Sequence, residues 1–336
     1  MPKTFYKTIL IGGLILAFAT FTFAQTERDK GIEFFKQGKN KEAVAALEKA
    51  SNEAKSDAEV LNYLGLAYVK SKDLKKAVKA HEKAVALSPQ SAVYRANLAY
   101  AYLLSSKLNK AQEESAKVIA LDPQNADAYY VRGSAAALEM KYDAAISDAD
   151  RAIAANADYA AAYTLKSDAL LAKFGKGIAV NMKSEENSKW ITDSKEALES
   201  CLKNCRNNLQ VTVQQERLDT VNAFYDYYSR RKNADPTSLV VVPKESNSNF
   251  TPGKILSKPF ASYTNKAREA QISGTISVLV LFAASGRVTH TIILQGLGYG
   301  LDENAINAAR KIVFEPAKEN GKPISQVKIV QYSFRI

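Results

Sequence analysis

Few side chains in this sequence are placed to catalyse a reaction or to bind a metal ion. The chain has two histidines, His81 and His290, and His290 has no cysteine or carboxylate nearby in the sequence. His81 falls in a segment with helical periodicity, where a packed histidine is favoured over a metal ligand. No nucleophile and base, and no glycine-rich phosphate loop followed by lysine, can be assembled. The sequence therefore predicts a protein that is not an enzyme and that has no cofactor.

The two cysteines, Cys201 and Cys205, stand four residues apart in a segment expected to be helical. In an exported protein they could be oxidised to a disulfide. Positions four residues apart on a regular helix are awkward for that bond. Two alternatives remain: a disulfide at a frayed helix end, or two half-buried thiols. A metal site is not favoured, because no histidine or further cysteine completes it.

Four tyrosines could take part in binding another protein. Tyr94, Tyr129, Tyr130 and Tyr163 each lie near the start of a predicted helix. Aromatic side chains are enriched among the residues that dominate protein interfaces. The alternative for each of them is packing between neighbouring helices.

These tyrosines belong to a region with an internal repeat of 34 residues. Small residues follow that spacing in two rows, which are Gly31, Gly65, Ala99, Gly133 and Ser167, then Ala43, Ala77, Ala111 and Ala145. A fixed period of this length indicates one structural unit copied along the chain. Such arrays present extended surfaces to other chains.

Each unit is predicted to be a pair of antiparallel helices. In the second unit they cover about residues 58–70 and 74–87, and Pro89 ends the pair because it lacks an amide hydrogen. Gly65 and Ala77 are expected where the two helices cross, since small side chains let the backbones approach.

The pattern resembles that of the tetratricopeptide repeat family over about residues 25–205. The resemblance rests mainly on Leu64, Gly65, Tyr68, Ala77, Ala84 and Pro89, then Leu98, Ala99, Tyr102, Ala111 and Pro123. We expect four clear units and an irregular fifth, whose first helix breaks at residues 174–177 and whose second resumes at about 190–203. Residues 206–232, with an amphipathic pattern, are expected to form a closing helix. The resemblance implies that the four tyrosines line the inner, partner-binding face.

Residues 233–256 hold three prolines and predict a linker. Beyond it the apolar period changes from that of a helix to that of a strand. Strands are expected over residues 274–283, 287–295 and 327–336, with a helix over 302–311 before the last strand. The sequence thus predicts a small β-β-α-β domain.

Residues 257–336 resemble the C-terminal domain of the TonB family. Matching motifs are spread along the segment, among them Ser285-Gly286-Arg287-Val288, Phe314-Glu315-Pro316-Ala317 and Asn320-Gly321-Lys322-Pro323. The resemblance implies a periplasmic domain whose exposed edge strand pairs with an extended peptide of an outer-membrane transporter. We expect the last strand to be that edge, with partner contacts at Val327, Ile329, Gln331, Ser333 and Arg335.

The N-terminus has the features of a secretory signal peptide. Lys3 and Lys7 precede a charge-free stretch over residues 8–23. Thr22-Phe23-Ala24 then places small residues at the −3 and −1 positions of a cut before Gln25. We expect residues 1–24 to be removed, and retention as an inner-membrane anchor is the less favoured alternative. The chain would contact a membrane only if this segment is retained.

The stretch over residues 8–23 also departs from a TonB energy transducer, which keeps an N-terminal helix with a polar Ser/His face. This stretch has no histidine, and repeats stand where a transducer has a proline-rich spacer. These differences argue against coupling to a proton-driven motor. The resemblance of the C-terminal domain does not depend on them.

The net charge of +11 is spread along the chain, so nucleic-acid binding is not favoured. The predicted fold is an all-α repeat solenoid followed by a small α+β domain. The predicted function is a non-enzymatic adaptor in the periplasm, which binds protein partners in the cell envelope. One partner would sit on the repeats, and an outer-membrane TonB-dependent transporter or similar extended segment on the last strand, with energy-dependent transport as one use. The alternative is a structural scaffold for envelope complexes without energy coupling.

Overall fold

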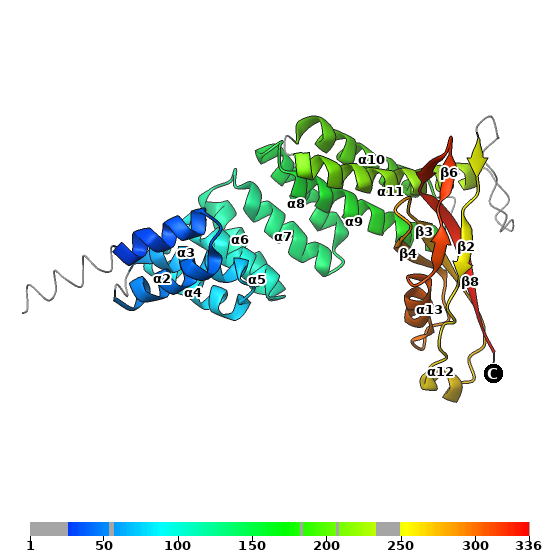
Figure 1. Ribbon diagram of the computed structural model, residues 1–336, viewed down its shortest axis with the longest axis horizontal. Coiled ribbons are helices and arrows are strands. Elements are labelled where there is room, and N and C mark those ends of the chain that lie inside the picture. The colour runs from blue at the N-terminus through cyan, green and yellow to red at the C-terminus, as the bar shows by residue number, and fades with distance from the viewer. Residues whose placement is uncertain (1–25, 54–56, 182–183, 206–207, 233–248, 336) are drawn as a thin grey trace, which may run out of the picture. The chain divides into compact units, whose positions relative to one another are not determined.

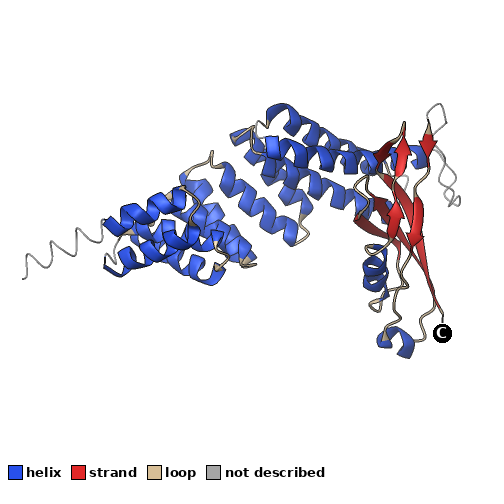
Figure 2. Cartoon of the chain, in the orientation of Figure 1, coloured by secondary structure: helices blue, strands red, loops and turns tan. Residues whose placement is uncertain are grey.

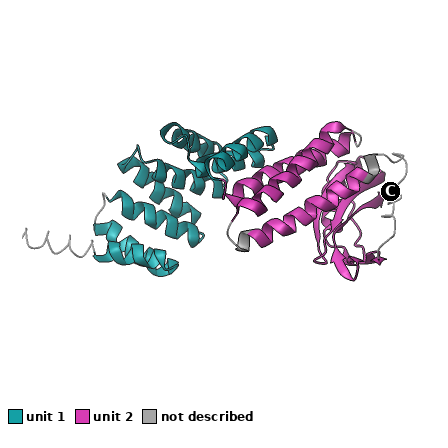
Figure 3. Cartoon of the chain, turned by 90° about the horizontal axis from the view of Figure 1, so that it is seen from above, with its two compact units in different colours: residues 1–156 teal, residues 157–336 magenta. Residues whose placement is uncertain are grey.

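The computed structural model describes residues 26–53, 57–181, 184–205, 208–232 and 249–335. The predicted signal peptide, residues 1–24, lies outside them. The chain divides into two compact units, Met1–Asn156 and Ala157–Ile336, coloured separately in Figure 3. Helices form the first unit, and the second combines long helices with antiparallel strands (Figure 2).

Helices follow one another along the first unit at the spacing of the repeat (Figure 1). After a helix over residues 26–36 come α2 (Asn40–Glu53), α3 (Ala58–Lys70), α4 (Leu74–Leu87), α5 (Ala92–Leu104), α6 (Leu108–Leu121), α7 (Ala126–Leu138) and α8 (Tyr142–Ala155). The predicted bounds of α3 and α4 are those observed. The all-α solenoid is confirmed.

The repeat places a capping residue before the first helix of successive units. The side chains of Asp57, Ser91 and Asn125 each accept a hydrogen bond from a main-chain N–H in the first turn of α3, α5 and α7. These bonds satisfy donors that the helix itself leaves unpaired, and each stabilises the fold by about 1 kcal/mol. The 34-residue spacing therefore fixes where these helices begin.

A residue with positive φ stands in the turn between the two helices of each of the first four repeats. Gly38, Lys72, Ser106 and Met140 are 34 residues apart, with φ of 74°, 63°, 56° and 60°. Residues other than glycine adopt this region at a cost of roughly 1–2 kcal/mol. The same turn conformation therefore occurs in three repeats that have Lys, Ser or Met at this position, although glycine would adopt it most easily.

Small residues lie where the helices of a pair meet, as predicted. A side chain on Gly31 would overlap Leu47, and a Cβ on Gly65 would lie 2.5 Å from the ring of His81. Ala77 is fully buried. Larger residues at these positions would force the paired helices apart.

The fifth repeat differs from the prediction at its glycines. α9 (Ala160–Val180) runs without interruption through residues 174–177, and α10 (Glu185–Asn204) begins earlier than expected. The predicted break is wrong because the glycines permit close contacts: a side chain on Gly177 would overlap Asn187, and one on Gly175 would touch Ile292. α11 (Asn208–Lys232) follows and packs against α10.

The second unit ends in a three-stranded antiparallel sheet in the order β4-β3-β8 (Figure 1). β3 (Gly274–Phe282) is central, between β4 (Val288–Gln295) and β8 (Gln326–Phe334). α13 (Leu301–Ala309) lies between β4 and β8 in the sequence. The predicted β-β-α-β order is confirmed.

Shorter elements complete this region. α12 (Asn265–Glu269) precedes β3, β2 (Lys254–Ser257) pairs with β5 (Val313–Glu315), and β6 (Ala317–Glu319) pairs with both β1 (Phe250–Thr251) and β7 (Lys322–Ile324). The predicted linker, residues 233–256, lies outside the described residues up to 248. Its remaining residues form strands, which are too short to show a period in the sequence.

Helices pack against both faces of the central sheet. Ile276 and Val280 of β3 pack with Leu301 of α13. On the other face Leu281 of β3 and Val327 of β8 share a core with side chains of α9, α10 and α11. The last helices of the array and the sheet therefore belong to one folded body.

Candidate protein-binding surfaces

β8 pairs with β3 along its whole length, from Gln326 to Phe334. Within the part of the chain that the structure describes, no strand forms a backbone ladder with the other side of β8. An edge strand presents N–H and C=O groups that another extended chain can satisfy. The outer edge of β8 is therefore a candidate binding surface.

The five residues predicted to meet a partner along β8 do not share one environment. Val327 is buried and Ile329 is half-buried, and both pack in the core beneath α11. Gln331, Ser333 and Arg335 are exposed. Only these three can offer side chains to a partner, which corrects the prediction for Val327 and Ile329.

The exposed end of this sheet face is polar. Ser333 Oγ lies 3.1 Å from Thr275 Oγ1, and Gln331 donates to Ser277 Oγ at 3.5 Å. The face thus changes from apolar to polar after Ile329, because the helices of the array cover only its apolar part.

Two lysines bond to main-chain carbonyls beside the outer edge of β8. Lys328 Nζ donates to the carbonyl of Gly253, and Lys258 Nζ donates to that of Gln331, each at 3.1 Å. We infer that the Gln331 carbonyl points away from β3. In an antiparallel pair the N–H of a residue points to the same side as its C=O. Gln331 therefore offers an outward-facing donor and acceptor.

Two of the predicted tyrosines make the same local contact in successive units. The hydroxyl of Tyr129 donates to the carbonyl of Pro123 at 3.3 Å, and that of Tyr163 to the carbonyl of Ala157 at 3.2 Å. Arg95 bonds to the equivalent carbonyl of its own unit at 2.7 Å. Each of these side chains holds the loop before its own helix, which is α5, α7 or α9. The contact therefore stabilises the repeat array.

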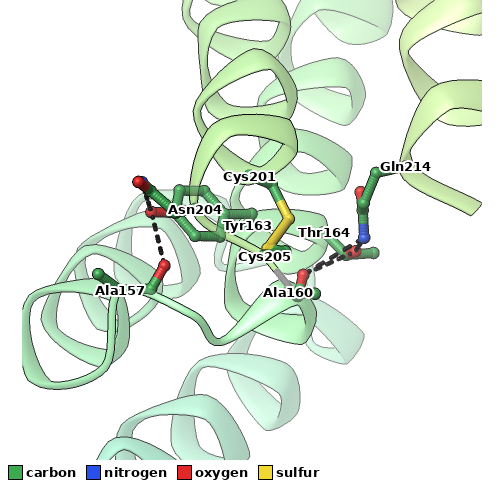
Figure 4. The surroundings of a disulfide bond; sticks show 8 residues. All are labelled: Ala157, Ala160, Tyr163, Thr164, Cys201, Asn204, Cys205 and Gln214. Atoms are coloured by element: carbon green, nitrogen blue, oxygen red, sulfur yellow. Dashed lines mark hydrogen bonds between the residues drawn. A yellow bond between two sulfur atoms is a disulfide. The ribbon is translucent and has the colours of Figure 1, made fainter. Parts of the chain in front are cut away.

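Tyr163 is only 4% exposed, and its hydroxyl also accepts a hydrogen bond from Asn204 at 3.1 Å (Figure 4). Its side chain is not available to a partner, which corrects the prediction for this residue. Tyr94 and Tyr130 are half-buried and pack against a core cluster. Part of each ring therefore stabilises the repeats.

An exposed apolar stripe lies on α5 instead. Val93, Tyr100 and Leu104 expose 61%, 41% and 39% of their surface. Their spacing of seven and then four residues places them on one side of the helix. Leu138, the equivalent of Leu104 on the adjacent helix α7, exposes 64%. Large apolar residues outside the repeat consensus were the signal that could have found this stripe.

Tyr130 lies beside this stripe. Burial, and then the nearby Tyr130 and Asp127, raise the pKa of Tyr100. The stripe therefore joins one predicted residue to three that the sequence analysis missed.

The histidines act as packing residues. His81 is fully buried with neither ring nitrogen hydrogen-bonded, and burial lowers its pKa to about 4. The ring of His290 packs edge-on against Phe224 at 6.1 Å, and burial lowers its pKa. Across the described ranges, no three His, Cys, Asp or Glu side chains gather as metal ligands would.

Cys201 and Cys205 form a disulfide at the end of α10 (Figure 4). Cys205 is the residue at which α10 ends, and its φ of −78° and ψ of 122° are those of extended backbone. The Cα atoms are 5.2 Å apart, a usual separation for a disulfide. The chain leaves the helix at Cys205, which removes the difficulty of bridging two residues within one regular helix.

Two segments of the chain match known families. Residues 28–92 match the family described as tetratricopeptide repeat, and residues 260–336 match the family described as Gram-negative bacterial TonB protein C-terminal. The chain joins tetratricopeptide repeats to a TonB C-terminal domain. That domain holds α12, α13 and the β4-β3-β8 sheet. None of the described helices has both the length and the apolar character needed to cross a bilayer.

Several solved structures are similar to parts of this chain. A MamA protein is 24% identical over 54% of this chain and 94% of its own, with a TM-score of 0.46. A thermophilic TPR protein of Thermus thermophilus is 18% identical over 59% and 98%, with a TM-score of 0.47. The pilF protein of Pseudomonas aeruginosa is 14% identical over 63% and 90%, with a TM-score of 0.47. No curated protein matches the chain.

Proposed function

We propose that this protein is a periplasmic adaptor that holds one protein on its repeat array and an extended segment of another on β8. The outer edge of β8 is the observation that carries the proposal. Helices cover one face of its sheet and the apolar part of the other, while Gln331 offers outward main-chain groups and Ser333 is exposed. Repeats and TonB C-terminal domains are protein-binding modules, which supports an adaptor without catalytic activity.

The partner of the array would contact the apolar stripe on α5. Val93, Tyr100 and Leu104 are large, exposed and on one side of the helix. Apolar and aromatic residues of this kind commonly form the centre of protein interfaces. Tyr130 would border that contact, and Tyr129 of α7 would support it through its hydrogen bond to the loop before that helix.

The partner of β8 would be an extended segment of an outer-membrane transporter. Main-chain bonds along the edge would give affinity, and side chains at alternate positions would give specificity. The shared core of the sheet with α9, α10 and α11 would then connect a load on β8 directly to the array.

A periplasmic location is supported by the disulfide and by the type of C-terminal domain. Disulfides persist in oxidising compartments such as the periplasm. The signal peptide proposed for residues 1–24 would direct export, and the mature chain would begin at Gln25. Intact-mass measurement of the exported protein tests this cut, because retained residues 1–24 would contradict it.

The alternative function is a scaffold that assembles envelope complexes without energy coupling. It is favoured by the uncharged stretch over residues 8–23, which has no histidine. An adaptor coupled to a proton-driven motor would lose activity when the proton gradient is dissipated, whereas a scaffold would keep its partners.

Photo-crosslinking in cells tests the site on β8. A photoreactive amino acid is placed at Ser333 in the full chain, and at Ser285 in the turn after β3 as the matched control, since both residues are exposed. We expect a crosslink from position 333 to a short extended segment of an outer-membrane transporter, identified by peptide mass spectrometry. Equal crosslinking from both positions, or products containing only this chain, would contradict strand addition at β8.

A further inference from the structure

The outer edge of β8 is flanked by residues 253–258, which we name the strap. Its strand β2 pairs with β5, and among the described residues no backbone ladder joins it to β8. Lysine side chains bridge the two instead, from Lys328 to the Gly253 carbonyl and from Lys258 to the Gln331 carbonyl. The strap therefore borders the edge without satisfying its main chain as a strand would.

The space between the strap and β8 is incompletely filled. A cavity of about 10 Å³ is lined by Gly253, Gln326 and Lys328, among others, which is room for about one water molecule. Gln326 Oε1 is buried without a hydrogen-bond partner. The contact between the strap and β8 thus leaves the Gln326 side-chain oxygen without a partner, and another chain could satisfy it.

Charge along this edge is mainly positive. The strap and residues 326–335 contain Lys254, Lys258, Lys328 and Arg335 but no aspartate or glutamate, and the acidic residue that lines the cavity is Glu315 of β5, opposite Lys254. Within the described ranges, Lys328 and Lys258 bond only to neutral carbonyls, and the Lys258 ammonium also lies 5.2 Å from the centre of the Tyr332 ring. Burial without a carboxylate partner lowers the pKa of Lys328.

We propose that the edge of β8 binds an extended segment that carries two carboxylates four residues apart. The Lys258 ammonium lies over the ring of Tyr332. Tyr332 and Lys328 are four residues apart on β8, so the two ammonium groups lie beside the same face of the strand. The carboxylates would replace the two carbonyls as partners of Lys328 and Lys258. Charge-assisted hydrogen bonds are roughly twice as strong as neutral ones. This inference rests on the strand addition proposed above and adds the chemistry of the partner.

Synthetic peptides with the full-length protein test the inference. The probe is a dye-labelled eight-residue peptide of alternating Val and Thr with Glu at its second and sixth positions. One matched peptide has Gln at both positions, and another has Glu at the second and fifth positions, which places the acids on opposite faces. We expect the first peptide to bind about fivefold to tenfold tighter than either control at low salt, by fluorescence anisotropy.

The variants Lys258→Met and Lys328→Met, combined, should reduce that preference to about twofold or less. The matched control, Lys318→Met with Lys322→Met, removes the same charge from the exposed β6 and β7 and should leave the preference intact. In the unmodified protein the preference should also shrink as salt is raised, because exposed ion pairs are screened. The salt dependence tests the inference without relying on the folding of a variant.

Equal binding of the three peptides would overturn the acidic preference while leaving strand addition standing. If Lys318→Met with Lys322→Met lost the preference for the diacidic peptide to the same extent, the preference would arise from net charge alone, and the proposed site would be overturned. Failure of all three peptides to bind would remove strand addition itself, and the inference with it.

Discussion

Gly175 of α9 lies against Ile292 of β4, so closely that a Cβ on the glycine would be 3.2 Å from Cδ1 of the isoleucine. The contact joins the irregular fifth repeat to the TonB C-terminal domain. It belongs to the core in which Phe174 and Phe224 pack against Leu281 of β3. The repeat array therefore ends in the hydrophobic core of the sheet.

Gly175→Leu is expected to weaken the packing of α9 against β4. Overpacking a close contact costs typically 1–3 kcal/mol, so thermal melts should show the second unit losing stability. Gly175→Ala is the matched control, since its single methyl meets a contact that a small shift of Ile292 relieves. A leucine variant as stable as the unmodified chain would mean that α9 and β4 are not held together in solution.

The helix crossing in the second repeat makes a similar prediction. Gly65→Leu or Ala77→Leu should destabilise the array by about 1–3 kcal/mol, because the added atoms meet His81 or a fully buried site. Lys75→Ala changes an exposed residue and should have an effect near zero. Urea unfolding of the full chain separates these cases, and equal midpoints would contradict the packing described.

The turn residue Ser106 offers a stabilising change. Its φ of 56° is one that glycine adopts freely, as Gly38 does at the equivalent position with φ of 74°. Ser106→Gly is therefore expected to stabilise the fold by up to about 1 kcal/mol. Gly38→Ala is the reverse change and should destabilise by a similar amount. Both are read from thermal unfolding, and a loss of stability in Ser106→Gly would show that the hydroxyl matters more than the backbone.

His81 should make stability depend on pH. Its folded-state pKa of about 4 lies below the ordinary value of 6.5, because burial disfavours the charged ring. The unfolded chain therefore binds the proton first, and stability is full above pH 6.5 and falls as pH drops toward 4. Between pH 7.5 and 5 the loss is about 2 kcal/mol. Urea unfolding of His81→Leu should lack this part of the slope, and parallel slopes in both proteins would contradict it.

Proline substitutions test which main-chain groups of β8 are available. Gln331→Pro removes an N–H that points outward and should abolish binding of the diacidic peptide while leaving the sheet folded. Tyr332→Pro removes an N–H directed at β3 from a buried residue, so it should unfold the domain. Circular dichroism checks folding, and anisotropy checks binding. Peptide binding retained by Gln331→Pro would place the partner elsewhere.

Much of the helical array could be predicted from the sequence because its determinants are local. The caps Asp57, Ser91 and Asn125 and the small residues at helix crossings recur every 34 residues. Each acts on its own unit or on the next, so a period in the sequence is enough to find it. The order of strands and helix in the TonB C-terminal domain followed from its change of apolar period in the same way.

The candidate binding surfaces were decided by contacts between residues far apart in the chain. The sequence shows that Val327 and Gln331 lie on one face of β8, but only the packing of α11 makes the first buried and the second exposed. Glycines at 175 and 177 predict a break in the helix, but in the structure they make room for Ile292 and Asn187. Local periodicity determines which residues share a face, whereas burial depends on which other element covers that face. Only the tertiary structure decides that.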